Sequence, residues 1–117
     1  MIEYHGWVTL CCTDETWDDG QWGHAREAVE REIARFKVED GHWVVFAETA
    51  ESMQSLQLSG NTEQDIAPLL RLMEFVGRTI PGSYGELVVL QGDRPDLATA
   101  SRYRLADGRV TAAKGGA

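Results

Sequence analysis

Apolar side chains recur with two different periods along this chain, and the order of those periods constrains the fold more than any other feature. Residues 4–11 and 53–59 alternate with a period of two, which is typical of β-strands that bury one face. Elsewhere apolar residues return every three or four positions, which indicates amphipathic helices. The first helical set is Trp22, Ala25, Val29, Ile33 and Phe36, and the second is Ile66, Leu69, Leu70, Met73, Val76 and Ile80.

Aspartate, glycine and proline mark where these elements begin and end. Asp18 or Asp19 can cap the exposed amides of the first helix, and Asp40-Gly41 should end it. Pro68 would cost a hydrogen bond inside a helix, so the second helix should begin near Asp65. The other expected boundaries are a strand from about His42 to Glu48, a stop of the next strand at Gly60-Asn61-Thr62, and a stop of the second helix at Pro81-Gly82.

The last third of the chain predicts three more strands. Residues 84–91 are apolar on both faces at Leu87 to Leu90, which favours a central position in a sheet. Residues 101–105 and 109–112 should form a hairpin that turns at Asp107-Gly108.

The resulting order, β-α-β-β-α-β-β, indicates an α+β fold. Two β-α-β halves can place both helices on one face of a mainly antiparallel sheet, giving a two-layer sandwich. A ferredoxin-like topology is one way to connect it. A chain of 117 residues has the size of one domain, which we expect over residues 1–112, followed by a flexible tail over residues 113–117.

Acidic residues dominate the chain and lie mostly in its first half. The net charge is -8, and residues 1–65 hold 14 Asp and Glu against 4 Lys and Arg, whereas residues 66–117 hold 5 against 7. This balance argues against a nucleic-acid-binding surface, because phosphate contacts need clustered Lys and Arg. Two explanations remain open: solubility, or electrostatic complementarity to a basic protein partner.

Cysteine spacing and hydropathy argue against a secreted or membrane protein. Cys11 and Cys12 are adjacent, so we expect reduced thiols, and they lack the C-x-x-C spacing of a redox or zinc site. No apolar run approaches the ~20 residues that span a bilayer. Met1-Ile2-Glu3-Tyr4 does not start a secretory signal. We therefore expect a cytoplasmic protein that does not bind membranes.

The histidines and carboxylates do not predict catalysis or metal binding. His5, His24 and His42 have no convincing sequence partners. His24 and Glu27 share a helical face, but a carboxylate-bridged metal site would need a second such pair. The acidic residues before Gly20 do not follow the ligand spacing of an EF-hand loop, and a solvated loop that caps a helix explains them better.

The segment Gly82-Ser83-Tyr84-Gly85 carries no catalytic signature. A nucleophile elbow would place glycines two residues before and after the serine. Neither a Walker motif nor G-x-G-x-x-G occurs in the chain. We therefore expect no catalytic residue, no metal and no cofactor, and a protein that is not an enzyme.

Four tryptophans lie in the acidic first half, at positions 7, 17, 22 and 43. Trp22 and Trp43 fit a buried helix face and a buried strand face, whereas Trp17 is surrounded by acidic residues and is hard to bury fully. An exposed aromatic side chain ringed by charge is typical of a binding hot spot. The predicted partner-binding residues are Asp14, Glu15, Trp17, Asp18 and Asp19.

Three short segments, Glu3-Tyr4-His5-Gly6-Trp7, Ser83-Tyr84-Gly85 and Tyr103-Arg104-Leu105, resemble the immunity protein 7 family of bacterial polymorphic-toxin systems. The resemblance spans nearly the whole chain. It implies a small cytosolic α+β protein that binds and neutralises a cognate toxin domain, commonly a nuclease, and so protects the producing cell and its siblings.

The residues that carry the resemblance look structural. Gly6 and Gly85 would permit close approach of strands, and Tyr4, Trp7 and Tyr84 would supply aromatic packing across strands. They need not touch the toxin.

The acidic stretch from residue 14 to residue 51 is the candidate interface, because a nuclease must present positive charge to its substrate. Glu86 stands where an apolar residue is expected, which leaves the orientation of that strand open. Two other functions stay open. One is a small-ligand-binding or enzymatic α+β domain with a cleft between sheet and helices near His5, His42 and Tyr84. The other is a homo-oligomeric structural module.

Overall fold

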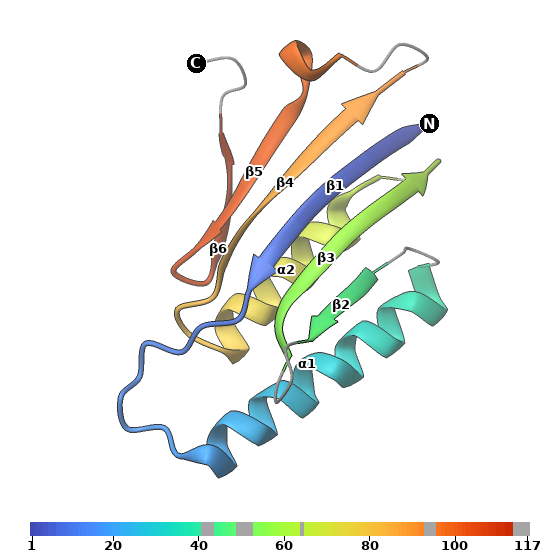
Figure 1. Cartoon of the computed structure of the whole chain (residues 1–117). Coiled ribbons are helices and arrows are strands. Elements are labelled where there is room, and N and C mark those ends of the chain that lie inside the picture. The colour runs from blue at the N-terminus through green and yellow to red at the C-terminus, as the bar shows by residue number, and fades with distance from the viewer. Residues whose placement is uncertain (41–43, 49–52, 64, 93–95, 114–117) are drawn as a thin grey trace.

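Strands and helices follow one another in the predicted order (Figure 1), in a computed structural model that describes residues 1–40, 44–48, 53–63, 65–92 and 96–113. The elements are β1 (Ile2–Thr9), α1 (Asp19–Asp40), β2 (Val44–Glu48), β3 (Met53–Thr62), α2 (Ala67–Thr79), β4 (Tyr84–Gln91), the short 3-10 helix η1 (Leu97–Thr99), β5 (Ser101–Ala106) and β6 (Arg109–Ala113). The α+β fold predicted from the sequence is confirmed.

The strands form one antiparallel sheet with the order β2-β3-β1-β4-β5-β6. Helix α1 leads from β1 to β2 across the intervening β3, and α2 leads from β3 to β4 across the intervening β1. This is the ferredoxin-like topology that the order of elements allowed, extended at one edge by the β5–β6 hairpin. Strand β4 lies beside β1 at the centre of the sheet, as its apolar faces predicted.

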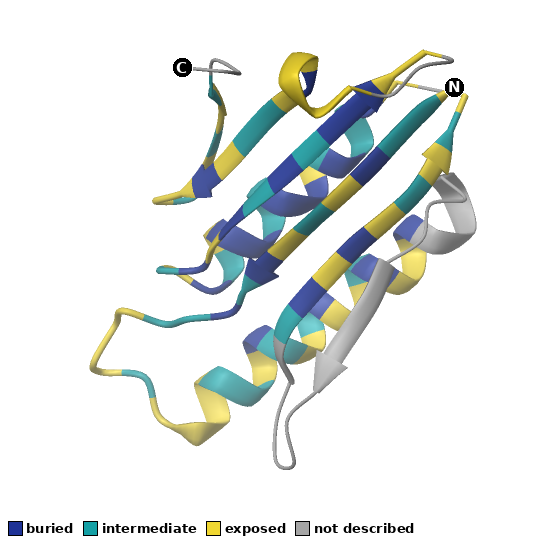
Figure 2. Ribbon diagram, turned by 45° about the horizontal axis from the view of Figure 1, so that its top comes forward, coloured by how far each residue is buried: buried dark blue, intermediate teal, exposed yellow. Residues whose placement is uncertain are grey.

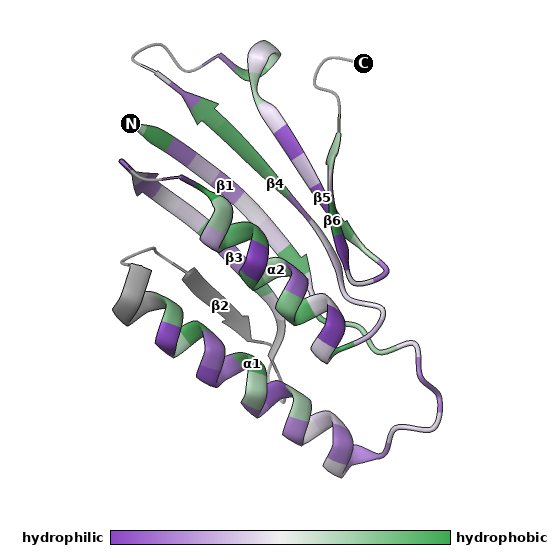
Figure 3. Cartoon of the chain, turned by 180° about the vertical axis from the view of Figure 1, so that it is seen from behind, coloured by the Kyte–Doolittle hydropathy of each residue, from purple (hydrophilic) through white to green (hydrophobic). Residues whose placement is uncertain are grey.

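Both helices cover the same face of the sheet, so that α2 lies behind the strands in Figure 1 and in front of them in Figure 3. Strand β1 shows the reason. Its side chains alternate between the two faces, with Tyr4 and Val8 buried and His5 and Trp7 exposed. Figure 2 shows the same banding of buried and exposed residues along the central strands.

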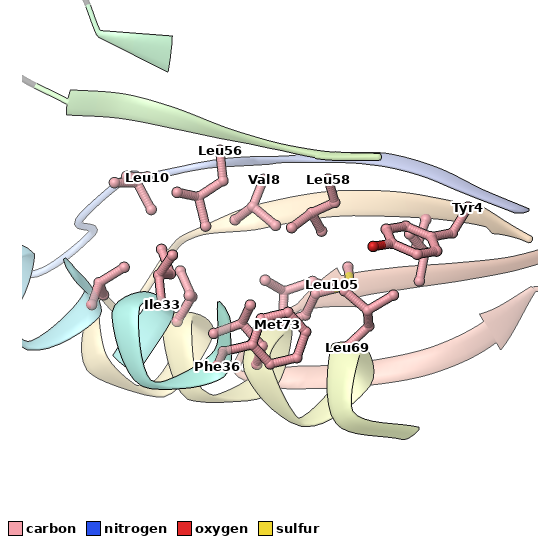
Figure 4. Close-up of a cluster of buried hydrophobic side chains, with 14 of the residues drawn as sticks. Tyr4, Val8, Leu10, Ile33, Phe36, Leu56, Leu58, Leu69, Met73 and Leu105 are labelled. Carbon is pink, nitrogen blue, oxygen red and sulfur yellow. The ribbon is translucent and has the colours of Figure 1, made fainter. Parts of the chain in front are cut away.

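The buried side chains of the strands meet those of the helices in one apolar core (Figure 4). Each large aliphatic side chain in it contributes roughly 1.5–3 kcal/mol by leaving water. The largest fully buried members are Tyr4, Phe36, Ile33, Leu56, Leu58, Leu69, Met73, Ile80, Leu87 and Leu105. The sheet–helix interface is therefore a packed apolar layer.

A reciprocal pair of hydrogen bonds begins α1. The Gln21 amide donates to Asp18 Oδ1 at 2.8 Å, and the Asp18 amide donates to Gln21 Oε1 at 2.9 Å. This capping box satisfies two amides that the helix itself cannot pair. Of the two predicted caps, Asp18 is therefore the cap, and Asp19 is the first helical residue.

Helix α2 begins two residues later than predicted. Ile66 occupies the N-cap position and Pro68 lies in the first turn, where a missing amide removes no helical hydrogen bond. Asp65 stays outside the helix, although its carboxylate accepts a hydrogen bond from the Ala67 amide at 3.3 Å.

Strand β3 continues through Gly60-Asn61-Thr62, where the sequence predicted that it would stop. The reason lies in its partner, because β1 begins at Ile2 and pairs Ile2 with Thr62 and Tyr4 with Gly60. The alternation predicted the first strand over residues 4–11. Strand β1 runs from Ile2 to Thr9, so it both starts and ends two residues earlier.

The predicted hairpin between β5 and β6 is present. Asp107 and Gly108 both have positive φ, 52° and 73°, as a two-residue turn of this hand requires. Ala113, predicted to begin the tail, is the last residue of β6. Residues 114–117, and the predicted strand residues His42 and Trp43, lie outside the described residues.

Candidate functional site

The acidic loop, residues 11–19, covers most of the connection between β1 and α1 and the first residue of α1, and it contains every residue predicted to bind a partner. Its first part is fixed to the connection between α2 and β4. The Thr13 amide donates to the Pro81 carbonyl oxygen at 2.8 Å, and the Cys11 amide donates to the buried Ser83 hydroxyl at 3.3 Å. The acidic residues therefore project from an anchored segment.

Asp14 folds the middle of the acidic loop into a local turn. Its Oδ1 accepts hydrogen bonds from the Thr16 hydroxyl at 2.6 Å and from the Thr16 amide at 2.9 Å. These bonds hold the pKa of the Asp14 carboxyl below its usual value. Asp14 is thus a fully ionised, solvent-exposed carboxylate at neutral pH.

Asp18 and Asp19 end the loop at the N-terminus of α1. Asp18 is committed to the capping box, whereas no described residue is seen to donate a hydrogen bond to the Asp19 carboxylate. Both side chains are exposed, and negative charge at this end of a helix is favourable because the first amides carry partial positive charge. The two aspartates therefore differ in how far their charge can be changed without disturbing the helix.

Trp17 is less exposed than an isolated hot-spot residue would be. It is half-buried against the core, and its ring lies 6.5 Å from that of Trp22, which in turn packs under the Arg26 guanidinium at 5.9 Å. The prediction that Trp17 is hard to bury fully is consistent with this position. Its packing anchors the acidic loop to α1.

The acidic loop has no basic residue near it in the sequence and no recorded ion pair within the described residues. Residues 1–25 contain no Lys or Arg, and the first of these residues along the chain is Arg26. The carboxylates of Asp14, Glu15, Asp18 and Asp19 make no ion pair with any described residue, whereas other carboxylates of the described chain do. Their charge therefore faces solvent and is available to a partner.

The sheet face without helices carries a second cluster that the sequence did not identify as exposed. Trp7 is 43% exposed and Tyr84 is 48% exposed, and their rings meet edge to face with centroids 5.8 Å apart and an interplanar angle of 89°. The expected aromatic packing across strands is present in this pair, which we call the aromatic pair. Tyr4 lies on the opposite, buried face.

Close backbone contact between β1 and β4 supports the aromatic pair. A side-chain carbon placed on Gly6 would lie 2.6 Å from the Glu86 carbonyl oxygen, and one on Gly85 would lie 2.9 Å from the Val8 Cα. Glu86 points to the open face, where the Arg102 guanidinium reaches its Oε1 at 3.1 Å. That ion pair explains why an acidic residue is tolerated in a central strand.

Of the three residues expected to line a ligand-binding or enzymatic cleft, His42 lies outside the described residues, and Tyr84 lines a hollow of about 490 Å³ together with Thr13 and Arg78 of α2. His5 does not line this hollow; it lies on the open face, with its Nε2 3.5 Å from Glu3 Oε2. Nor does the described part of the chain hold any group of three or more His, Cys, Asp or Glu side chains that could bind a metal ion.

Comparison with known proteins gives one match. A family model described as immunity protein 7 matches residues 1–115. No curated protein and no solved structure matches the chain. Within the described residues, no helix is both long and apolar enough to cross a membrane.

Proposed function

The chain belongs to the immunity protein 7 family, and on that basis we propose that it binds a cognate toxin domain and thereby neutralises it. The observation that supports a binding mechanism is the acidic loop, with exposed carboxylates that no cation of the described chain pairs. Inhibition is then stoichiometric, because a charged surface acts by staying bound to its partner.

We further propose that the toxin domain is a nuclease. A nuclease surface must carry positive charge to hold nucleic-acid phosphates. Asp14, Glu15 and Asp19 can face such a surface, while Trp17 holds the loop against α1 and Asp18 keeps the helix capped. The inhibitor then either occupies the phosphate-binding surface itself or binds next to it and sterically blocks access of the nucleic acid.

Electrostatic complementarity of this kind affects encounter more than final affinity. Charged patches of opposite sign accelerate association, and the acceleration falls as salt screens them, with a Debye length of about 8 Å at physiological ionic strength. We therefore expect tight one-to-one binding with an association rate that decreases steeply with salt.

The test is a calorimetric and kinetic titration of the chain against the toxin domain encoded by the neighbouring gene, at low and moderate salt, together with an assay of the toxin's nuclease activity. The informative variant is Glu15→Lys, because Glu15 is exposed and makes no hydrogen bond or ion pair recorded in the described residues, whereas Asp18→Lys would also remove a helix cap. We expect Glu15→Lys to slow association several-fold at low salt and less at moderate salt.

Glu63→Lys is the charge-change control, on a side chain that is 76% exposed just beyond the end of β3; Glu63 lies 3.9 Å from the N-terminal amine, and an exposed pair of this kind contributes little to stability. Equal slowing by both variants would show a general charge effect and would reject the acidic loop as the contact. Absence of binding by the unmodified chain would reject the proposed function itself.

A further inference from the structure

We infer that the aromatic pair, Trp7 and Tyr84, is the apolar centre of the surface on which the toxin domain docks, with the acidic loop at its border. This inference rests on the proposed function and specifies where the partner sits. The sequence identified these residues only as members of structural motifs.

Exposure of the pair is unusual for the described part of this chain. Only four large apolar side chains are exposed there, and Met1 and Leu97 are the other two. Scattered exposed apolar residues are normal on soluble proteins, but Trp7 and Tyr84 touch each other and so form one continuous apolar area. Trp and Tyr are also the residue types that most often dominate binding energy at protein interfaces.

The backbone beneath the pair is rigid. Trp7 and Tyr84 come from β1 and β4, the two central strands, which are held together by the close approach at Gly6 and Gly85. Aromatic side chains on such a base lose little conformational freedom when a partner covers them, and this low cost favours affinity.

The carboxylate beside the pair is itself partnered. Glu86, the direct cross-strand neighbour of Trp7, is paired with Arg102, and Arg104, opposite Glu86 on β5, adds positive charge to the same face. A partner that covers the two rings therefore need not bury an unpaired carboxylate at the centre, which would be costly. An apolar centre within a polar rim is the usual anatomy of a protein interface.

The aromatic pair and the acidic loop belong to one continuous surface. Tyr84 and Thr13 line the same hollow, of about 490 Å³, together with Arg78 and Asp107. Asp14 follows Thr13 directly, so the acidic loop borders this hollow. The partner that fits this surface is a protein domain with basic side chains around an apolar one.

Two other occupants fit less well. A second copy of the chain docked by the same face would bring two acidic loops of like charge to one interface, and a single-stranded nucleic acid stacked on the rings would meet the same carboxylates. Charge complementarity therefore selects the basic toxin domain.

The test is a calorimetric titration of Trp7→Ala and Tyr84→Ala with the toxin domain encoded by the neighbouring gene. Each variant should raise Kd at least tenfold. The matched control is Leu97→Ala, which truncates a side chain that is 68% exposed in η1, and it should change Kd less than twofold. Far-UV circular dichroism and thermal unfolding of each variant establish that it is folded.

A second measurement does not depend on truncation. Trp7→Phe assigns the indole N–H signal of Trp7 in the NMR spectrum, and adding toxin domain to the unmodified chain should shift that signal. Unchanged Kd in both aromatic variants, or an unmoved indole signal in a saturated complex, would overturn the inference while leaving the proposed function intact.

Failure of the unmodified chain to bind the toxin domain would instead remove the proposed function, and this inference with it. Light scattering that shows a dimer dispersed by Trp7→Ala, or a single-stranded oligonucleotide whose binding that variant abolishes, would assign the face to another occupant and overturn the inference.

Discussion

Tyr4 and Trp7 lie three residues apart on β1, yet Tyr4 is 0% exposed and Trp7 is 43% exposed. Both are large aromatic residues in the same central strand, so neither residue type nor strand position explains the difference. The two helices explain it, because they cover only the face toward which Tyr4 points (Figure 3). The covered face stabilises the fold, and the open face leaves Trp7 and Tyr84 exposed.

This contrast predicts unequal costs for neighbouring residues of β3. Leu56→Ala should destabilise the protein by about 2–5 kcal/mol, because it leaves a cavity in the core, while Gln57→Ala on the open face should change stability by less than about 0.5 kcal/mol. Urea unfolding followed by circular dichroism measures both. Similar losses in the two variants would show that the open face is also packed.

Two glycines show the same contrast between packed and open positions. A side-chain carbon on Gly85 would meet the packed backbone of β1, whereas one on Gly23 of α1 would have nothing within 4 Å. Gly85→Ala should cost about 1–3 kcal/mol by forcing β1 and β4 apart. Gly23→Ala should stabilise by about 0.5–1 kcal/mol, since alanine is the better helix former. The free energy of unfolding of both variants checks this, and a neutral Gly85→Ala would contradict the close strand approach.

Within the acidic loop, structure and charge can be separated. Asp18→Ala removes a helix cap and should cost about 0.5–2 kcal/mol, whereas Asp19→Ala loses only a favourable charge near the helix N-terminus, worth about 0.3–1 kcal/mol. Thermal unfolding at fixed pH and salt compares them. A larger loss for Asp19→Ala would mean that the capping box contributes little.

The smallest expected effect concerns the helix surface and depends on pH. The Arg35 guanidinium donates hydrogen bonds to Glu32 and so lowers the pKa of its carboxyl. A carboxyl with a lowered folded-state pKa contributes stability above its unfolded-state pKa, and that contribution disappears as pH falls through the folded value. Glu32→Gln should therefore cost less than about 1 kcal/mol at neutral pH.

The difference between wild type and Glu32→Gln should shrink as pH falls below about 5. Urea unfolding at several pH values follows it. A difference that grew at low pH would reverse the assigned sign. Asp14→Asn is not a matched control, because Asp14 is bonded within its own loop and its pKa has a different cause.

Local chemistry made much of this fold predictable. Alternation in β1, the apolar run in β4, helical spacing from Trp22 to Phe36, and the Asp107-Gly108 turn each depend on residues close in sequence. Where the predicted end of an element was wrong, pairing with a segment distant in the sequence set the actual end. Strand β3 passes its expected stop at Gly60 because β1 is there to pair with it.

The candidate site divides in the same way. Asp14, Glu15, Asp18 and Asp19 could be picked out because they cluster along the chain. Trp7 and Tyr84 lie 77 positions apart, and no periodicity in the sequence predicts that they touch. Sequence reasoning therefore identified the charged loop and the cross-strand aromatic packing, but not the exposure of Trp7 and Tyr84 on the open face.

By itself the sequence determined the element order, the alternation of faces in β1, the apolar faces of the two helices and the sign of the charge at the first loop, because periodicity, capping and charge are properties of neighbouring residues. The tertiary structure alone decided which face of the sheet the helices leave open. That choice depends on strand order and on the side to which both connections cross, and these arise from contacts between segments far apart in the chain.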